Sequence, residues 1–363
     1  MKKVYRHIFK TISVIILAVI MFLAAGFFAV KFGFTNVAGE EDANSFAYNQ
    51  IAKIEPVKNG LPKNLSVYGE SENYNWCRLG MAAEVSPYDA AGMLKAYQKT
   101  KSKELLDHMI LVLELRKGGK LSPCNNEPGF WNESNLNEAL AKPIGQSSYT
   151  WINSEPWQVI KESILKEKPQ IDQAAKVAGV QPRLLVSVAI VEQLRLYYTQ
   201  RELYEKLFKP LKILANANKM AWGTMSIKEK MAIETENHLH DKNSPYYLGP
   251  ESEKLLDYSN STDVAKERYS RLTDERNHYY SYLYGALIIK QFQTQWQKSG
   301  YDLTYRPEII ATLFNIGFSH SEPKDNPTVG GSTLDINGEK YYFGSLAYEF
   351  YYSGELTEEF PFE

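Results

Sequence analysis

The sequence predicts a mainly helical protein with more than one domain. Its 363 residues can bury a sizeable core and exceed the usual length of a single domain. Apolar residues recur at helical spacing through most of the segment 151–363, whereas alternating, strand-like residues are confined to 333–343. No internal repeat or low-complexity tract interrupts this pattern.

The N-terminal segment predicts a membrane anchor. Residues 11–30 carry no charge, and about 20 apolar residues suffice for a helix that spans a bilayer. Four basic residues lie within 1–10 and only Lys31 follows the apolar segment closely, so we expect a cytoplasmic tail at 1–10 and export of everything after the span. A cleaved signal peptide is the alternative, although its apolar region is normally shorter and no convincing cleavage site follows Val30.

The segment 31–60 has few apolar residues and is predicted to be a linker. Five of the 41 Lys and Arg residues lie in 1–39, which holds no acid. The remaining 36 basic residues face 43 acidic residues, so the exported part has a net charge of −7. Because a nucleic-acid partner requires a basic face, we do not expect the chain to bind nucleic acid.

Residues 61–150 are predicted to form a small helical domain of unknown role. Ser86-Pro87 begins one helix, Ser102 caps another, and Gly118-Gly119 ends it. The stretch 121–150 is rich in Pro, Asn, Gly and Ser and is predicted to be a loop. Cys77 and Cys124 both lie beyond the anchor, where they can form one disulfide or remain two free thiols.

Residues 151–363 are predicted to form a second, larger helical domain. The predicted helices cover 156–178, 182–198, 200–217, 226–240, 262–298 and 306–314. The one strand signal is a hairpin at 333–343, in which Asn337-Gly338 supplies the turn between two short alternating arms.

Glu192 occupies a position where the helical pattern calls for a hydrophobe. Gly179 suits the end of one helix, and Pro182 suits the first turn of the next. The apolar residues that share its stripe are Leu185, Val188, Ala189 and Leu196. Glu192 is therefore predicted to be buried, and a buried carboxyl that stays protonated can act as a general acid. The alternative is a structural glutamate that is solvated or paired with a Lys or Arg.

Three segments in order resemble the lysozyme-like fold of the lytic transglycosylases, a family that cleaves peptidoglycan. Residues 174–193 read Ala-Ala-Lys-Val-Ala-Gly-Val-Gln-Pro-Arg-Leu-Leu-Val-Ser-Val-Ala-Ile-Val-Glu-Gln, like the helix pair that delivers the family's catalytic Glu. Residues 222–228, Trp-Gly-Thr-Met-Ser-Ile-Lys, resemble its Gly-Leu-Met-Gln-Ile-Lys segment. Residues 311–317, Ala-Thr-Leu-Phe-Asn-Ile-Gly, resemble its Ala-Tyr-Asn-Ala-Gly segment. The resemblance spans roughly residues 170–350.

The resemblance implies a lysozyme-like catalytic domain at 151–363, with Glu192 as the only catalytic residue and no cofactor. Together with the anchor predicted at 11–30, the resemblance implies a bacterial inner-membrane protein. The anchored protein is expected to present this domain to peptidoglycan in the periplasm or outside the cell. The substrate-binding residues carried over are Gly223, Thr224, Met225, Ser226, Ile227, Phe314 and Asn315. Gln193, Ser226 and Phe314 depart from the family's Ser, Gln and Tyr, and the long spacing between the last two segments implies an insertion at 241–277.

Other constellations are weaker. His238, His240 and Asp241 lack a further ligand at a recognised spacing, so no metal site is predicted. Tyrosine doublets offer rings to sugars, although most such rings pack in cores. The second-carboxylate candidates for a glycosidase are Glu202, Glu234 and Glu236. The functional alternatives are a catalytically inactive glycan-binding domain, a lysozyme-type hydrolase, and an envelope scaffold whose protein partner binds residues 61–150.

Overall fold

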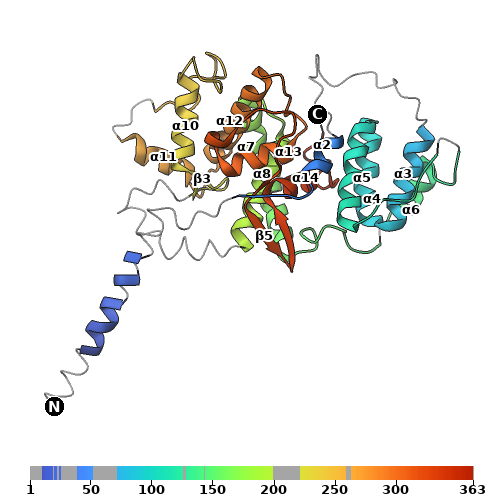
Figure 1. The fold of residues 1–363 in the computed structure, drawn as a ribbon, viewed down its shortest axis with the longest axis horizontal. Helices are drawn as coiled ribbons and strands as arrows, with labels where there is room; N and C mark the ends of the chain where they lie inside the picture. Colours follow the sequence, from blue (N-terminus) through green and yellow to red (C-terminus); the bar gives the residue numbers. More distant parts are fainter. Residues whose placement is uncertain are drawn as a thin grey trace.

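The computed structural model is mainly helical, as the sequence predicts (Figure 1). It describes residues 10–18, 20–22, 24–25, 39–51, 72–125, 128–142, 144–198, 221–258 and 263–362. Figure 1 shows two groups of helices side by side, a smaller one that contains α3 to α6 and a larger one that contains α7, α8 and α10 to α14.

The N-terminal pieces that the structure describes are helical, and all of their residues are exposed. Other residues of the predicted span at 11–30, among them residues 26–30, lie outside the described part of the chain. Within the described ranges, no helix has both the length and the apolar character needed to cross a bilayer. The membrane anchor therefore stays a prediction.

The smaller group is built from α3 (Glu72–Val85), α4 (Pro87–Thr100), α5 (Lys103–Lys117) and α6 (Glu133–Leu140). The predicted boundaries are confirmed: Pro87 opens α4, the Ser102 hydroxyl accepts a hydrogen bond from the Leu105 N–H at 3.1 Å, and Gly118 ends α5 with a φ of 69°. A disulfide joins Cys77 to Cys124 and settles the alternative that the sequence left open.

The prediction of an uninterrupted loop at 121–150 is wrong for α6. The Asn132 side chain accepts hydrogen bonds from the N–H groups of Ser134 and Asn135, and the Asn135 side chain accepts one from the Asn132 N–H. Leu136 and Leu140, one turn apart, are buried. A reciprocal cap and two apolar residues on one face thus suffice for a helix in a stretch whose composition favours turns.

The larger group is built from seven helices within the described residues. They are α7 (Glu155–Ala178), α8 (Pro182–Tyr198), α10 (Glu229–His240), α11 (Val264–Leu272), α12 (Tyr279–Lys298), α13 (Pro307–Ile316) and α14 (Phe343–Tyr352), with a short 3₁₀ turn at Phe318–His320. The predicted helix at 262–298 is two helices, because the Asp274 side chain accepts the N–H groups of Arg276 and Asn277 in a turn. The predicted helix at 200–217 lies outside the described residues.

The strands of the described residues form three antiparallel pairs. They are β1 (Glu40–Glu41) with β4 (Gly330–Gly331), β2 (Ala221–Trp222) with β3 (Ile227–Lys228), and β5 (Thr333–Ile336) with β6 (Glu339–Tyr342). The hairpin predicted at 333–343 is confirmed, since Asn337 and Gly338 have φ values of 54° and 86° between β5 and β6. The strand pair β2–β3 replaces the start of the helix predicted at 226–240.

The segment 39–51 corrects the prediction of a linker at 31–60. It forms β1 and the helix α2 (Ser45–Ile51), which pack against the larger group of helices. The Ser45 hydroxyl donates to the Val329 carbonyl at 3.1 Å, and the buried Tyr48 ring lies 4.8 Å from the ring of Tyr348. One tyrosine and one strand pair therefore fix a segment that composition alone marks as too polar to pack.

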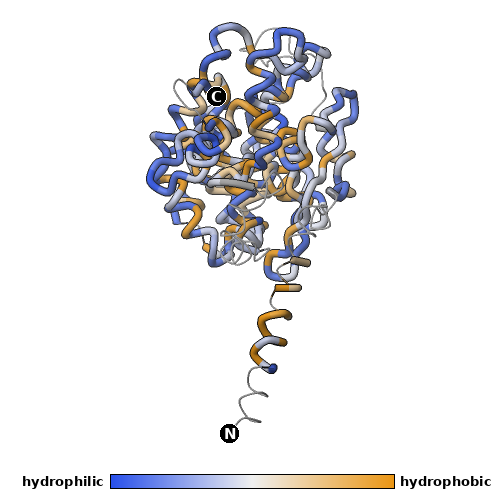
Figure 2. The backbone as a smooth tube through the Cα atoms, turned by 90° about the vertical axis from the view of Figure 1, so that its left-hand side faces the viewer, coloured by the Kyte–Doolittle hydropathy of each residue, from blue (hydrophilic) through white to orange (hydrophobic). Residues whose placement is uncertain are grey.

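A single hydrophobic core runs through both groups of helices. Figure 2 shows hydrophobic segments throughout the body of the protein and in the helical piece near the N-terminus. The two groups are also joined by charge: Arg116 of α5 pairs with Glu349 of α14 and with Glu339 of β6, and lies 4.0 Å from the centre of the Tyr341 ring. The domain boundary predicted near residue 150 is thus crossed by packed and ion-paired side chains.

Candidate active site

Helix α8, which carries Glu192, is anchored at its first turn. The preceding helix α7 ends at Gly179 with a φ of 68°, and α8 begins at Pro182, as predicted. Arg183 is fully buried and donates hydrogen bonds of 2.9 Å to the backbone carbonyls of Tyr351, Glu355 and Phe360. The C-terminal segment of the protein therefore holds α8 in place, a role for Arg183 that the helical pattern alone does not reveal.

Glu192 lies near the C-terminal end of α8 and is only 3% exposed, so its predicted burial is confirmed. Its Oε2 atom accepts hydrogen bonds from Arg195, three residues later on the same helix, including one of 3.0 Å from Nε. A pair with an arginine is what the sequence analysis gave as the alternative to a catalytic role, namely a structural glutamate. This ion pair occupies Oε2, one of the two carboxylate oxygens of Glu192.

The segment 222–227 forms a tight hairpin beside α8. Gly223 has a φ of 70°, and a Cβ atom there would come within 2.0 Å of the Leu272 carbonyl, so only glycine fits. The Met225 N–H donates to the Ser281 hydroxyl at 3.1 Å. The amide of Gln193 donates to the Thr224 carbonyl at 2.5 Å and links the hairpin to the residue next to Glu192.

Asn315 lies on α13, which packs against α8. Its Oδ1 atom accepts hydrogen bonds of 2.9 Å from both the N–H and the hydroxyl of Ser332. Gly331, with a φ of 102°, brings the backbone to this atom: a Cβ at Gly331 would lie 3.0 Å from Asn315 Oδ1. The segment that follows β4 therefore fixes the orientation of the Asn315 amide.

The predicted substrate-binding residues divide into two sets by their exposure. Gly223, Thr224 and Asn315 are half-buried and remain accessible to a ligand. The buried residues are Met225, Ser226, Ile227 and Phe314. These four buried residues support the site from the core. The Phe314 ring packs among apolar neighbours, which explains why it lacks the hydroxyl of the family's Tyr.

Glu236 is occupied by structural partners. Its carboxylate accepts hydrogen bonds from Arg268 at 2.6 and 2.7 Å, from Tyr258 at 2.6 Å and from Tyr284 at 2.5 Å. Burial alone would raise the pKa of Glu236, but these hydrogen bonds outweigh it and lower that pKa. Because Tyr258 and Arg268 belong to the predicted insertion at 241–277, the insertion is tied to α10 through this cluster.

The other two candidates for a second carboxylate give no better site. Glu234 is part of a helical ion pair, 3.6 Å from Lys230. Glu202 lies outside the described residues. The contacts of Glu234 and Glu236, the two candidates that the structure describes, therefore place neither carboxylate beside Glu192.

The histidines of the segment 238–241 have separate partners. His238 Nδ1 is 2.9 Å from the Ser244 hydroxyl, and its ring packs against Tyr246 and Phe318. Burial lowers the pKa of His238. His240 Nε2 is 3.4 Å from an oxygen of Asp257. Over the described ranges, no group of three or more metal-binding side chains comes together.

Of the ten tyrosines in the five doublets, four are buried and five are half-buried. Tyr351 and Tyr352 are fully or almost fully buried, as is Tyr341. Tyr197 is the exception at the end of α8, where it is 52% exposed and lies edge-on to Tyr198 with a centroid distance of 5.2 Å. The helix that carries Glu192 therefore also presents an aromatic ring to solvent.

No family model, curated protein or solved structure matches this chain.

Proposed function

We propose that the protein is a lytic transglycosylase that cleaves the glycan strands of peptidoglycan. The observation that carries the proposal is the position of Glu192, a buried carboxylate near the end of the anchored helix α8. The adjacent Gln193 is bonded to Thr224 of the hairpin, and α13 with Asn315 packs against the same helix. The three segments that resemble the family are therefore neighbours in space.

The proposed reaction uses one carboxyl group twice. Glu192 first gives its proton to the glycosidic oxygen between N-acetylmuramic acid and N-acetylglucosamine while the bond from C1 to that oxygen breaks. The carboxylate then accepts the proton of the C6 hydroxyl of the same muramic acid, and O6 bonds to C1 to give a 1,6-anhydro end. The reaction needs neither water nor a second carboxylate, in keeping with the structural role of Glu236.

Arg195 sets the condition for this chemistry. Its guanidinium pairs with Glu192, and its side chain is 13% exposed. A bound glycan must draw Arg195 away before the carboxyl can meet the glycosidic oxygen. The exposed ring of Tyr197 on the following turn offers a flat face for a sugar.

The same ion pair favours one alternative, a lysozyme-like domain that binds glycan without cleaving it. In that protein the pair stays closed and Glu192 only supports the fold. A lysozyme-type hydrolase is a further alternative, in which water replaces the C6 hydroxyl and the product is a reducing sugar in place of an anhydro end.

The decisive experiment is digestion of purified cell walls by the full chain in detergent. We expect soluble muropeptides with anhydro ends by mass spectrometry, and a loss of rate of about 10²-fold or more in Glu192→Gln, since Gln cannot give up a proton. Glu234→Gln is the matched control, because it removes a carboxylate from another helix. Full activity of Glu192→Gln contradicts the mechanism, and wall binding without release supports the binding domain.

We further propose that residues 11–30 anchor the protein with its N-terminus in the cytoplasm and residues 40–363 outside the inner membrane. The smaller group of helices would then face the envelope, where it is available to a protein partner. Protease added to spheroplasts should digest the bulk of the chain. Full protection of the chain would contradict this orientation.

A further inference from the structure

The segment 39–51 forms a strap across the chain that leads into β4. Its strand β1 pairs with β4. The Ser45 hydroxyl accepts the Val329 N–H at 3.1 Å and lies 3.1 Å from the Val329 carbonyl oxygen. The Asn49 amide donates to the Pro327 carbonyl at 3.0 Å. The backbone from Pro327 to the end of β4 is therefore bonded to the N-terminal part of the protein.

The strap and β4 approach each other closely. A Cβ atom at Gly330 would lie 2.0 Å from the carbonyl oxygen of Glu40, and one at Gly39 would lie 3.1 Å from the Cα atom of Gly331. Glycine in a strand often marks such a close approach of two backbones. A larger residue at Gly330 would push β1 away from β4.

The backbone that the strap holds leads directly to Asn315. Ser332 follows β4, and its N–H and hydroxyl both donate to Asn315 Oδ1 at 2.9 Å. On α13, the Thr312 hydroxyl accepts the Gly330 N–H at 3.0 Å. The strand β4 is thus bonded to the strap and to the helix that carries Asn315. Two donors on Oδ1 turn the NH₂ group of Asn315 away from Ser332, where it can donate to a ligand.

We propose that the strap positions the Asn315 amide for the glycan, an inference that rests on the proposed function. Ser45 is then a positioning residue, which acts on Asn315 through β4 and Ser332 and touches no substrate itself. Because the predicted anchor at 11–30 precedes the strap, the same segment would connect membrane attachment to the order of the site.

The test is a double-mutant cycle in the full chain in detergent, measured as the initial rate of muropeptide release from purified cell walls. Ser45→Ala removes the hydroxyl that bonds Val329 and should lower this rate about tenfold. In the Asn315→Ala background the same change should lower the rate by less than about twofold, because the residue through which Ser45 acts is then absent. Ser45→Thr keeps the hydroxyl and should retain most of the wild-type rate.

Gly330→Ala tests the strand pair from the other side. Its Cβ atom forces the Glu40 carbonyl to move, so the initial rate should again fall only when Asn315 is present. Phe46→Ala is the matched control on α2, because this side chain is 71% exposed, and its rate should equal that of the wild type.

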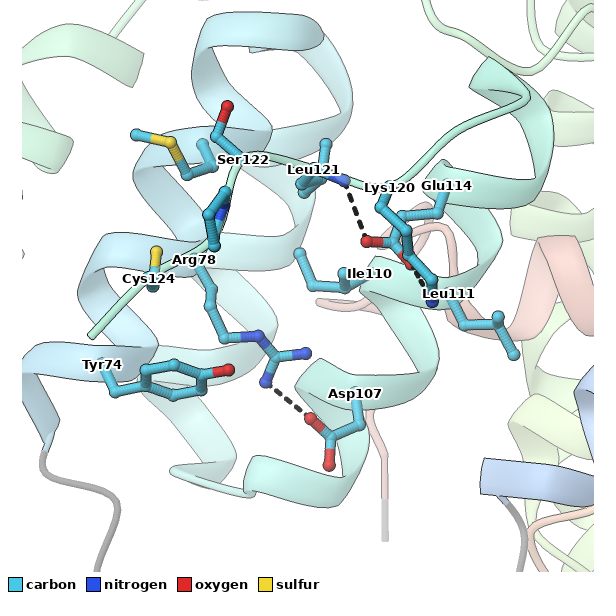
Figure 3. Close-up of a pocket in the computed structure, with 12 residues that line it drawn as sticks. Tyr74, Arg78, Asp107, Ile110, Leu111, Glu114, Lys120, Leu121, Ser122 and Cys124 are labelled. Atoms are coloured by element: carbon cyan, nitrogen blue, oxygen red, sulfur yellow. Dashed lines mark hydrogen bonds and ion pairs between the residues drawn. The ribbon is translucent and has the colours of Figure 1, made fainter. Parts of the chain in front are cut away.

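Arg78→Gln is the control for a general loss of stability. Arg78 pairs with Asp107 at 2.5 Å in the smaller group of helices (Figure 3). Breaking this pair should lower the Tm and leave the initial rate below that temperature unchanged. Amide hydrogen exchange followed by mass spectrometry should be faster over residues 327–332 in Ser45→Ala and Gly330→Ala than in the wild type, and unchanged there in Arg78→Gln.

The outcomes separate this inference from the proposed function. Release of muropeptides at equal rates by the wild type and Ser45→Ala overturns the role of the strap and retains the proposed function. An equal fractional loss of rate with and without Asn315 has the same meaning, since Ser45 would then act by another route. A wild type that releases no muropeptides overturns the proposed function and this inference together.

Discussion

Glu192 and Glu349 are both buried glutamates on helices, and each pairs with an arginine, yet the origin of that arginine differs. Arg195 lies on the same helix as Glu192, three residues away. Glu349 pairs with Arg116 of α5 and accepts a hydrogen bond of 3.2 Å from Trp151. Glu192 therefore has a partner from its own helix, whereas Glu349 is held by Arg116 of α5 and by Trp151.

The comparison shows that burial and an altered pKa do not by themselves identify a catalytic residue. Burial raises the pKa of Glu349 to about 7, even though Arg116 opposes the shift. Such a value would suit an acid–base catalyst near neutral pH. Both Glu349 oxygens are nevertheless occupied by side chains that join the two groups of helices. We therefore assign Glu349 to the architecture and Glu192 to the candidate site.

The largest expected effect is the loss of stability in Arg116→Ala. This change leaves the carboxylate of Glu349 buried without its charged partner and removes a contact to Glu339. Breaking a buried pair in this way typically costs about 3–5 kcal/mol. Urea unfolding followed by circular dichroism measures the loss. Lys95→Ala is the control, because its partner Glu358 is exposed and surface pairs contribute about 0–1 kcal/mol. Equal stability of the two variants would show that the ion pairs of Arg116 with Glu349 and Glu339 contribute little to the free energy of unfolding.

The next largest effect is a pH dependence of the free energy of unfolding that arises from Glu349. Its pKa of about 7 in the folded state exceeds the ordinary value of 4.5, so the folded state binds this proton more tightly than the unfolded state does. The contribution to stability is fully present below about pH 4.5 and is lost as the pH rises through about 7. The expected total is about 3 kcal/mol.

Other groups titrate in the same window, so the measurement must be a difference. Burial lowers the pKa of His108 to about 3, and this group adds stability as the pH rises toward 6.5. We therefore subtract the unfolding free energy of Glu349→Gln from that of the wild type. The contributions of His108 and of other groups that titrate in both proteins cancel in this difference. This difference should fall between pH 4.5 and 7, and a flat difference would contradict the raised pKa of Glu349.

Local signals in the sequence predict much of the fold. Gly179, Pro182, Ser102 and the Asn337-Gly338 pair each constrain only their neighbours in the chain, and the structure has the helix ends and the turn where they indicate. The burial of Glu192 follows from helical spacing in the same way. The division at 273–278 was missed because the apolar pattern of α11 and α12 continues across a turn that a single Asp side chain stabilises.

Contacts between distant segments could not be read from the sequence. The partners of Arg183 lie about 170 residues away, and nothing in the local pattern links Arg116 to Glu349. The pairing of Glu192 with Arg195 was open, since residues three apart on a helix face can interact or point into solvent. The role of Gln193 depends on Thr224, which only the fold brings near.

A smaller effect is expected for Arg195→Ala. The change leaves Glu192 buried and without the arginine that binds its Oε2 atom, and an unsatisfied buried group costs about 1–3 kcal/mol. We expect a loss within this range, below that of Arg116→Ala, because the pair with Glu192 lies within one helix and does not join two groups of helices. Arg195→Lys should recover part of the loss, since a single ammonium replaces the two-pronged guanidinium. A loss as large as that of Arg116→Ala would place Arg195 in the architecture as well.

The smallest effect is expected for the stability of Glu192→Gln. Gln has nearly the same size and can still accept a hydrogen bond from Arg195, while the cost of burying a charge disappears. The Arg195 side chain is 13% exposed, so its charge remains in contact with water after the change. We therefore expect the unfolding free energy to change by less than about 1 kcal/mol. Thermal and urea unfolding of the purified variant, with Glu349→Gln beside it, provide the comparison. A loss of several kcal/mol in Glu192→Gln would show that Glu192 is a structural residue like Glu349, and any loss of wall cleavage in that variant would then reflect unfolding.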